Sequence, residues 1–266
     1  MKASGLLLIV LAALALAAPL ASPHTVFATD FDARLLPPGL AGAHWFGTDE
    51  LGRDLFARTW SGTRLTLLVA VVASLVSLVI GVLWGAVAGL AGGRLDAAMM
   101  RTVDALFALP FIFLVILLMV AFERNFLLIF VAIGAINWLE MARIVRGETL
   151  SLKTRPFIDA ARIAGFSRAR ILLRHIVPNL AGTVAVYLTL TIPQAILVES
   201  FLSFIGLGVQ EPRSSLGSLV NDGVRQMEDA PWLLVVPASL LAVILLAFNF
   251  LGDGLRDRLD PRRRPA

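Results

Sequence analysis

The chain has 266 residues, of which 58% are hydrophobic and only 16% are charged, and its formal net charge is +4. A soluble domain carries about 25% charged residues, so this composition predicts a membrane protein that crosses the bilayer several times. The lack of cysteine excludes disulfides and cysteine-ligated metals, and His24, His44 and His175 lie too far apart in sequence to suggest a metal site.

Six apolar stretches approach the roughly 20 residues that a helix needs to cross the hydrocarbon core. We expect helices because a bilayer offers the backbone no partners and the stretches lack the alternation of barrel strands. The fourth is the weakest, since Asn137 and Glu140 lie near its end. The predicted spans are Gly5–Leu20, Leu65–Ala91, Ala105–Phe122, Phe126–Ala142, Ala181–Phe204 and Trp232–Leu251.

The first span has two interpretations. Lys2 followed by a Leu/Ala run is typical of a cleaved signal peptide as well as of a membrane anchor. We interpret it as an uncleaved anchor, because no small-x-small cleavage site stands out within Ala17–Ala21.

The positions of the basic residues predict the orientation. With six spans and the N-terminus inside, 16 Lys and Arg residues fall on the cytoplasmic side and 7 fall outside. Because cytoplasmic loops of membrane proteins are enriched in Lys and Arg, this asymmetry places both termini in the cytoplasm. The loop Arg143–Asn179 is then cytoplasmic, and the segments Ser22–Thr63 and Ile205–Pro231 are external.

The second span contains small residues at every fourth position: Ala73, Ser77, Gly81, Gly85 and Gly89. On a helix they form one ridge that lets another backbone approach closely. We expect this ridge to pack within the bundle. The alternative is a surface along which helices slide during a conformational cycle.

The fifth span carries a polar row on one face, formed by Thr183, Tyr187, Thr191 and Gln194, and Pro193 should kink it. This pattern fits a helix that lines a translocation path, and equally fits hydroxyls that bond their own backbone or a neighbouring helix. Glu199 follows near the outer end. It is a candidate for the same path, or it reaches the interface or pairs with an arginine.

The cytoplasmic loop predicts two short helices. Thr154 and Pro156 favour a helix start, and Phe157, Ile158 and Ala161 would form its apolar side. Asp159 suits its first turn. Gly165 would end this helix, and Ser167 would cap a second one that runs to Val177 before Pro178. Such a module could insert into a groove on a partner protein, or lie on anionic lipid headgroups.

Several motifs resemble one family in order. Asp159-Ala160-Ala161, Gly165 and Ile176–Asn179 resemble the EAA motif of ABC importer permeases, with aspartate in place of glutamate. The chain from about Trp45 to Arg264 is similar to the C-type subunit of dipeptide, oligopeptide and nickel importers. The other motifs that carry this resemblance are Phe46–Asp54, Gly92–Asp96, Arg143–Gly147, Leu150–Lys153, Glu199–Gly208 and Gly252–Asp257.

The resemblance implies an all-α type I ABC importer fold with about six transmembrane helices and a cytoplasmic coupling-helix loop. It divides the chain into an anchor with an external segment (residues 1–63), a permease core (64–252) and a basic cytoplasmic tail (253–266). It assigns ATPase coupling to the cytoplasmic module, through Asp159, Ala160, Ala161, Arg162 and Gly165. The implied location is the inner membrane of a bacterial or archaeal cell.

The resemblance also implies partners. These are a second, B-type permease subunit, two cytoplasmic ABC ATPase subunits and an extracytoplasmic solute-binding protein. The chain itself lacks a P-loop, because its only lysines, Lys2 and Lys153, do not follow a glycine. ATP and Mg²⁺ are therefore expected on the partner ATPase, with no cofactor in this chain.

Two other function classes were weighed. A secondary transporter driven by an ion gradient would need ionisable groups near the bilayer midplane, whereas Glu140 and Glu199 lie towards span ends. A membrane-embedded enzyme would need a nucleophile–base pair or a metal cluster, and the sequence suggests neither. By the same resemblance, peptides, nickel complexes, glutathione and some sugars or opines all stay open as cargo.

Overall fold

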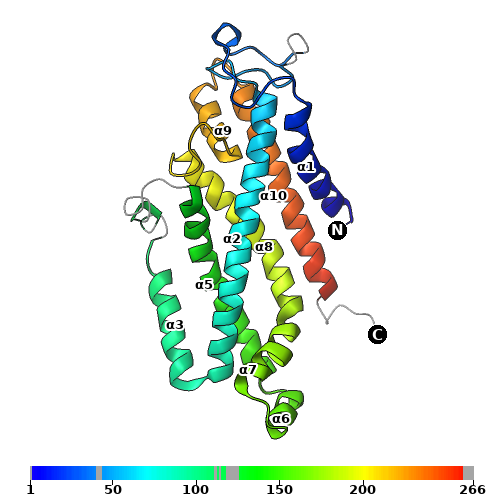
Figure 1. Ribbon diagram of the computed structural model, residues 1–266, viewed down its shortest axis with the longest axis vertical. Coiled ribbons are helices and arrows are strands. Elements are labelled where there is room, and N and C mark those ends of the chain that lie inside the picture. Colours follow the sequence, from blue (N-terminus) through cyan, green and yellow to red (C-terminus); the bar gives the residue numbers. More distant parts are fainter. Residues whose placement is uncertain (1, 40–43, 111–112, 114, 118–125, 260–266) are drawn as a thin grey trace. The chain divides into compact units, whose positions relative to one another are not determined.

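The computed structural model describes residues 2–39, 44–110, 113, 115–117 and 126–259. Regular structure in these ranges is helical, with one isolated bridge between Thr48 and Asp54. The helices, shown in Figure 1, are α1 (Lys2–Ala21), α2 (Leu55–Ala91), α3 (Gly93–Phe107), α5 (Phe126–Leu152), α6 (Pro156–Ile163), α7 (Arg168–Ile171), α8 (Val177–Phe204), α9 (Leu216–Arg225) and α10 (Trp232–Leu259), with a 3-10 turn at Phe31–Ala33 and a π-helical segment at Leu172–Ile176.

Four helical segments of the described chain are long and apolar enough to span a bilayer: Ala3–Ala21, Leu55–Ala91, Arg168–Phe204 and Trp232–Arg258. They contain the first, second, fifth and sixth predicted spans. The fourth prediction starts with α5, which continues to Leu152. Part of the third predicted span, Ala105–Phe122, lies outside the described residues, so the total of six spans stays a prediction.

The chain divides into two compact units. The first unit comprises residues 1–71 and 192–254, and the second comprises residues 72–191 and 255–266. Helices α2 and α8 contribute residues to both. The three parts that we predicted from sequence follow one another along the chain, whereas these units are defined by contacts in space. The three-part division therefore stays a prediction.

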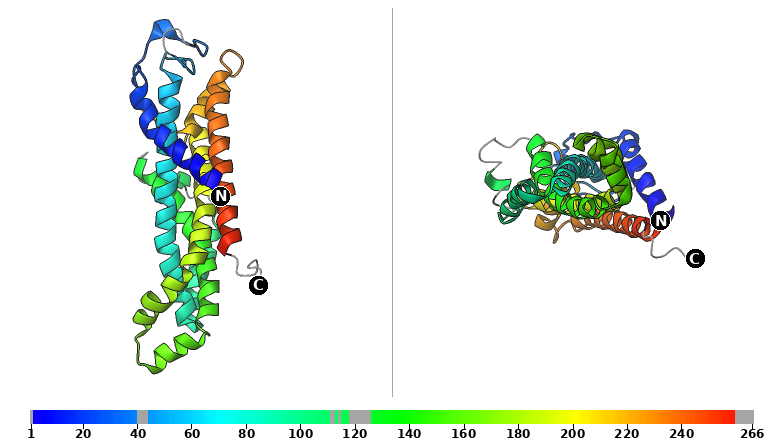
Figure 2. Two further views of the ribbon diagram at one scale, coloured as in Figure 1. Left: turned by 90° about the vertical axis from the view of Figure 1, so that its right-hand side faces the viewer. Right: turned by 90° about the horizontal axis from the view of Figure 1, so that it is seen from below.

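In the first unit, α1 lies against α10 near the start of the chain (Figure 2). A Cβ atom added to Gly5 would be 3.8 Å from Leu251 Cδ1, which is ordinary van der Waals contact. A small buried cluster of Leu55, Ala230 and Leu233 joins the start of α2 to the start of α10. Through these apolar contacts, α10 packs against both α1 and the start of α2.

In the second unit, the ridge of small residues on α2 packs against α5. A Cβ added to Gly81 would lie 2.6 Å from Met141 Cβ, and one added to Gly89 would lie 2.7 Å from Thr149 Cβ. Real Cβ contacts are much longer, so the two helices approach as closely as glycine allows. The ridge is therefore a packing surface, as we expected, and the sliding interpretation has no support in this arrangement.

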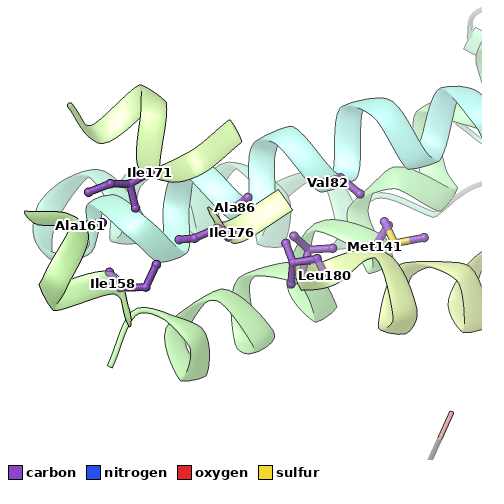
Figure 3. Close-up of a cluster of buried hydrophobic side chains, with 9 residues drawn as sticks. Val82, Ala86, Met141, Ile158, Ala161, Ile171, Ile176 and Leu180 are labelled. Carbon is purple, nitrogen blue, oxygen red and sulfur yellow. The ribbon is translucent and has the colours of Figure 1, made fainter. Parts of the chain in front are cut away.

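The main apolar core of the second unit joins α2 and α5 to the two-helix module of the loop, called the cytoplasmic module after its predicted location (Figure 3). Val82 and Ala86 of α2 and Met141 of α5 meet Ile158 of α6 and Ile176 of the π-helical segment. Burying a side chain of this size stabilises the fold by about 1.5–3 kcal/mol. The module is thus anchored to the helices above it by one face.

Two polar contacts fix the corner between α2 and α3. Arg146 of α5 donates from Nε and Nη2 to the two carboxylate oxygens of Asp96, at 2.6 and 2.8 Å. Lys153 Nζ donates to the carbonyl of Gly89 in the last turn of α2, at 2.9 Å. The hydrogen bonds from Arg146 lower the pKa of Asp96, since they favour its ionised form.

Candidate functional site

The module that the sequence places in the cytoplasm begins as predicted. Pro156 is the first residue of α6, where its missing amide hydrogen costs nothing, and Asp159 lies in the first turn. Thr154 does not cap this helix. Arg155 occupies the N-cap position, and Thr154 Oγ1 donates to the carbonyl of Ser151 at 2.9 Å.

Gly165 ends α6 in the left-handed conformation, with φ of 77°. Gly165 N donates to Arg162 O at 3.0 Å, and Phe166 N donates to Ala161 O at 3.1 Å. This pair of bonds is a Schellman motif, which favours glycine because a Cβ is strained at positive φ. The space around a Cβ added at Gly165 is open, so the constraint is on the backbone alone.

Ser167 caps α7, as predicted: its Oγ accepts from Arg170 N at 3.3 Å. The prediction that this second helix stops before Pro178 was wrong. The chain continues through the π-helical segment into α8, and Val177 N–H bonds to Leu172 O, five residues back. The wider π turn lies directly before the proline, which lacks the amide hydrogen that an α-helical ladder requires.

The module has an inner and an outer face. Ile158 and Ala161 are buried, as predicted, but Phe157 is 40% exposed. Phe157 precedes Ile158 by one residue, which turns it about 100° around the helix and away from the core. Ile163 is 88% exposed. In the described structure, the outer face therefore leaves Phe157 partly exposed and Ile163 almost fully exposed.

Charged residues complete the outer face. Arg162 Nη1 donates to Asp159 Oδ1 at 2.8 Å, three residues back on the same helix, and both side chains are exposed. Ala160 is exposed between them. An exposed pair of this kind contributes at most about 1 kcal/mol to stability, so it is available for a partner.

The predicted path residues on α8 fall in both units. Thr183, Tyr187 and Thr191 belong to the second unit, and Gln194 belongs to the first. Thr191 Oγ1 donates to its own backbone at Tyr187 O, 2.8 Å away, which is the local bonding that we weighed as the alternative. Tyr187 packs against the apolar core, and Gln194 is exposed. A path through these residues stays a prediction.

Glu199 is fully buried in the first unit, with 0% exposure. It neither reaches a surface nor, within the described chain, forms an ion pair. Its Oε1 accepts from Ser203 Oγ at 2.7 Å and its Oε2 from Thr66 Oγ1 at 3.1 Å and from Ser200 Oγ at 3.4 Å. Thr66 Oγ1 in turn accepts from Leu216 N at 3.1 Å.

These hydroxyls connect three elements through one carboxyl group. Thr66 lies on α2, Glu199 on α8 and Leu216 at the start of α9. A Cβ added to Gly217 would lie 2.5 Å from Ser200 Cα, so α9 sits directly on α8. Because a buried carboxyl must be satisfied by hydrogen bonds, this network holds α9 in place.

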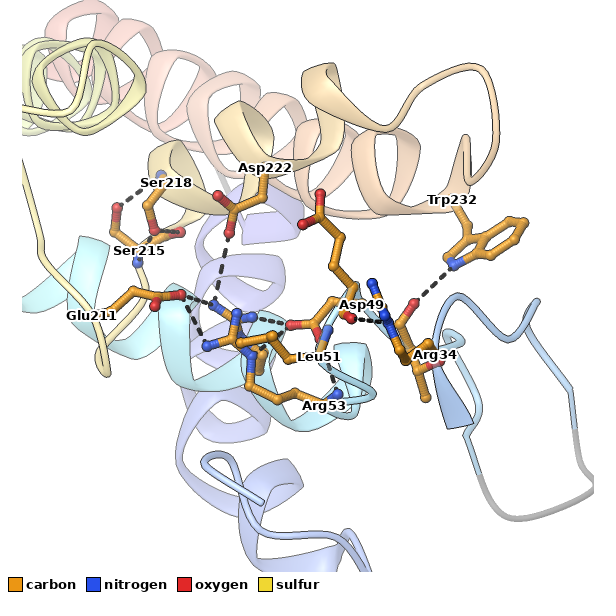
Figure 4. Close-up of polar contacts among 12 residues, drawn as sticks. Arg34, Asp49, Leu51, Arg53, Glu211, Ser215, Ser218, Asp222 and Trp232 are labelled. Atoms are coloured by element: carbon orange, nitrogen blue, oxygen red, sulfur yellow. Dashed lines mark hydrogen bonds and ion pairs between the residues drawn. The ribbon is translucent and has the colours of Figure 1, made fainter. Parts of the chain in front are cut away.

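A second polar cluster of the first unit was missed by sequence reasoning. Asp49 Oδ2 accepts from Arg53 Nε at 2.7 Å and also pairs with Arg58 Nη1. Arg53 Nη1 donates to Glu211 at 2.9 Å, and Arg58 Nη2 lies 3.8 Å from Asp222 (Figure 4). This charged cluster joins the segment before α2 to the loop after α8 and to α9.

One sequence signal pointed towards this cluster. Arg58 lies in the first turns of an apolar helix, where an arginine needs an acidic partner. The partners could not be named, because Glu211 is 158 positions away from Arg53. Among the described residues, this cluster included, no three His, Asp or Glu side chains come together as a metal-binding group.

The sequence was compared with known proteins. Residues 81–265 match the family described as the binding-protein-dependent transport system inner membrane component. The oligopeptide transport system permease protein OppC of Haemophilus influenzae is 52% identical, over 93% of this chain and 79% of that protein. OppC of Salmonella typhimurium is 52% identical over 98% and 87%. The dipeptide transport system permease protein DppC of Bacillus subtilis is 45% identical over 97% and 80%.

Solved structures give the same fold. An inward-facing structure of the MetNI methionine ABC transporter superposes with a TM-score of 0.58, covering 74% of this chain and 96% of that chain. The sequence identity is 19%, so this likeness concerns the fold alone.

Proposed function

Because this chain belongs to the family of inner membrane components of binding-protein-dependent transport systems, we propose that it is the C-type permease subunit of an ATP-driven importer of oligopeptides. The chain is a membrane-embedded permease subunit of an ABC importer. The peptide cargo rests on the names of its relatives, OppC and DppC. The implied partners are a B-type permease subunit, two cytoplasmic ATPase subunits that hold ATP and Mg²⁺, and an extracytoplasmic binding protein.

The observation that carries this proposal is the two-faced cytoplasmic module. Its inner face is fixed to α2, α5 and α8 by buried side chains, and its outer face exposes Phe157, Ile163 and the Asp159–Arg162 pair. A helix with apolar anchors and charges on its free face suits a groove on a partner protein. Closure of the ATPases would move the module and shift the helices between outward and inward openings.

Charge reversal at Asp159 tests the docking. Asp159→Lys breaks the pair with Arg162 and places two cations together on the outer face, so we expect less ATPase to copurify with the permease. Glu148→Lys is the matched control, because Glu148 is exposed on α5 outside the module. Equal copurification of the ATPase with both variants would contradict the proposed docking face.

Labelling tests the orientation. The chain contains no cysteine, so one introduced cysteine is the only target for a membrane-impermeant thiol reagent. We expect Arg170→Cys in the module to react only after the membrane is opened, and Arg225→Cys on α9 to react in intact spheroplasts. Labelling of Arg170→Cys from the outside would place the module on the wrong side for an ATPase.

A further inference from the structure

One face of α3 carries two arginines that have no acidic partner. Helix α3 packs against α2 and α5 through its other face, where Asp96 and Val103 are buried, whereas Arg94 and Arg101 are exposed. They are seven residues apart, which is almost two full helical turns, so both side chains leave the helix on the same side. Within the described chain, neither arginine forms an ion pair.

The arginines that reach α3 from α5 are neutralised. Arg146 bonds to both carboxylate oxygens of Asp96, and Arg143 Nη2 donates to Asp104 Oδ1 at 2.7 Å. These two pairs use both acids of α3. The positive charge of the two arginines on the exposed face therefore stays without a counter-charge on this helix.

Two exposed acids of α5 must also be weighed. Helical geometry turns Glu148 by about 160° and Glu140 by about 120° around α5 from Arg146, which points at α3. In the part of the chain that the structure describes, neither acid forms an ion pair with an arginine of α3. They do not cancel the charge of the exposed face.

The two arginines lie at the depth of a membrane surface. The apolar part of α2, Leu65–Ala91, rises by about 40 Å, which is about 10 Å more than the hydrocarbon core. Trp84 Nε1 donates to Met99 O at 3.3 Å, so this turn of α3 lies beside a point about 30 Å along α2 from Leu65. Tryptophan is enriched at this boundary between hydrocarbon and headgroups. Arg101 then lies at the boundary, and Arg94, about 10 Å further along the axis, lies in the headgroup layer.

We propose that Arg94 and Arg101 bind the phosphate groups of anionic phospholipids in the inner leaflet. The choice of leaflet rests on the orientation given under the proposed function. Guanidinium groups pair with phosphate in a bidentate manner, and a separation of about 10 Å along the helix suits two phosphates rather than one. Lipid is favoured over an acidic protein surface, because the headgroups at this depth already supply negative charge.

The test measures which lipid lies against α3 in the complete importer, reconstituted in nanodiscs. This chain contains no cysteine, so Ala98→Cys, on the exposed face between the two arginines, takes a single fluorophore when the partner subunits are also free of cysteine. Quenching by phosphatidylglycerol with a quencher on its acyl chain is compared with quenching by phosphatidylcholine labelled in the same way. We expect the anionic lipid to quench at a lower mole fraction, and added salt should reduce this difference.

Removal of the charge should remove the preference. Arg94→Gln and Arg101→Gln should each lower the preference for the anionic lipid about fivefold, and the double variant should lower it further. Arg94→Lys combined with Arg101→Lys keeps both charges and should keep most of the preference. Arg225→Gln is the matched control, because it removes an exposed arginine from α9, in the other unit, and should change nothing.

Two results would overturn the lipid site directly. One is equal quenching by the two lipids in the wild-type importer, and the other is a preference that survives in the double glutamine variant. A preference that appears only when the ATPase subunits are left out also overturns it, since a protein then covers this face in the importer.

Failure of the underlying function gives a different result. In intact spheroplasts, Ala98→Cys should react with a membrane-impermeant thiol reagent only after the membrane is opened. Reaction from the outside would show that the proposed orientation, and with it the inner leaflet, is wrong, whatever lipid α3 prefers. A wild-type importer that prefers the anionic lipid but takes up no peptide contradicts the proposed function alone.

Discussion

The close approach of α2 and α5 predicts a large effect from one added methyl group. In Gly85→Ala the new Cβ would lie 2.3 Å from the carbonyl oxygen of Ala142 and 2.9 Å from the backbone nitrogen of Arg146. Favourable contacts between heavy atoms need about 3.5 Å, so α5 must move back by roughly 1 Å. A backbone cannot rotate out of the way as a flexible side chain can.

The expected cost follows from two opposing terms. Overpacking of a tight contact typically costs about 1–3 kcal/mol, and replacing glycine by alanine within a helix returns about 0.5–1 kcal/mol. A net loss of about 1–2 kcal/mol remains. It is increased if the shift of Arg146 also weakens its two hydrogen bonds with Asp96.

Thermal melting of the purified permease complex in detergent measures this loss. Gly147→Ala is the matched control, because Gly147 lies on α5 with nothing within 4 Å of an added Cβ, so it should keep or slightly raise the melting temperature. We expect Gly85→Ala to melt several degrees lower, at about 2–4 °C for each kcal/mol. Equal melting of the two variants would refute the proposed close packing of α2 on α5.

Three further predictions concern the cytoplasmic module, the buried carboxyl and the corner ion pair. Gly165→Val should reduce peptide uptake far more than Gly165→Asn, since asparagine tolerates positive φ; equal uptake would exclude a backbone cause. Glu199→Leu should expose α9 to external protease while Glu199→Gln, which keeps hydrogen bonds, should protect it. The lowered pKa of Asp96 means that the stability contributed by its pair with Arg146 is full above about pH 4 and lost as pH falls through the lowered value. The melting temperatures of the wild-type protein and of Asp96→Asn should therefore differ less at pH 3 than at pH 7.

Short-range signals made the cytoplasmic module predictable. Pro156, Gly165 and Ser167 each act on the few residues beside them, through a missing amide, a positive φ and a side-chain cap. The apolar lengths of four spans were predictable for the same reason. Pro178 was misread because a proline signal is ambiguous: a wider helical turn accommodates it as well as a helix end does.

Long-range contacts could not be predicted from one sequence. The position of Glu199 near a span end suggested access to water, yet Thr66 and Leu216, which complete its network, are 133 and 17 residues away. The pairing of Arg53 with Glu211 also joins residues far apart in the sequence, 158 positions from each other. Pattern analysis finds a charge that needs a partner, but folding decides which distant residue supplies it.

The unbroken path from α7 through the π-helical segment into α8 has a mechanical consequence. A flexible linker would absorb a push applied at Ser167, whereas a hydrogen-bonded rod transmits it along its axis. The π-helical segment can also change its winding. If Leu172–Ile176 converted to an α-helix, α7 would rotate about the helix axis by about 100° for each residue by which the register shifts. The helix that would transmit the motion and the π-helical turn that would change its length and rotation are thus one continuous stretch of backbone.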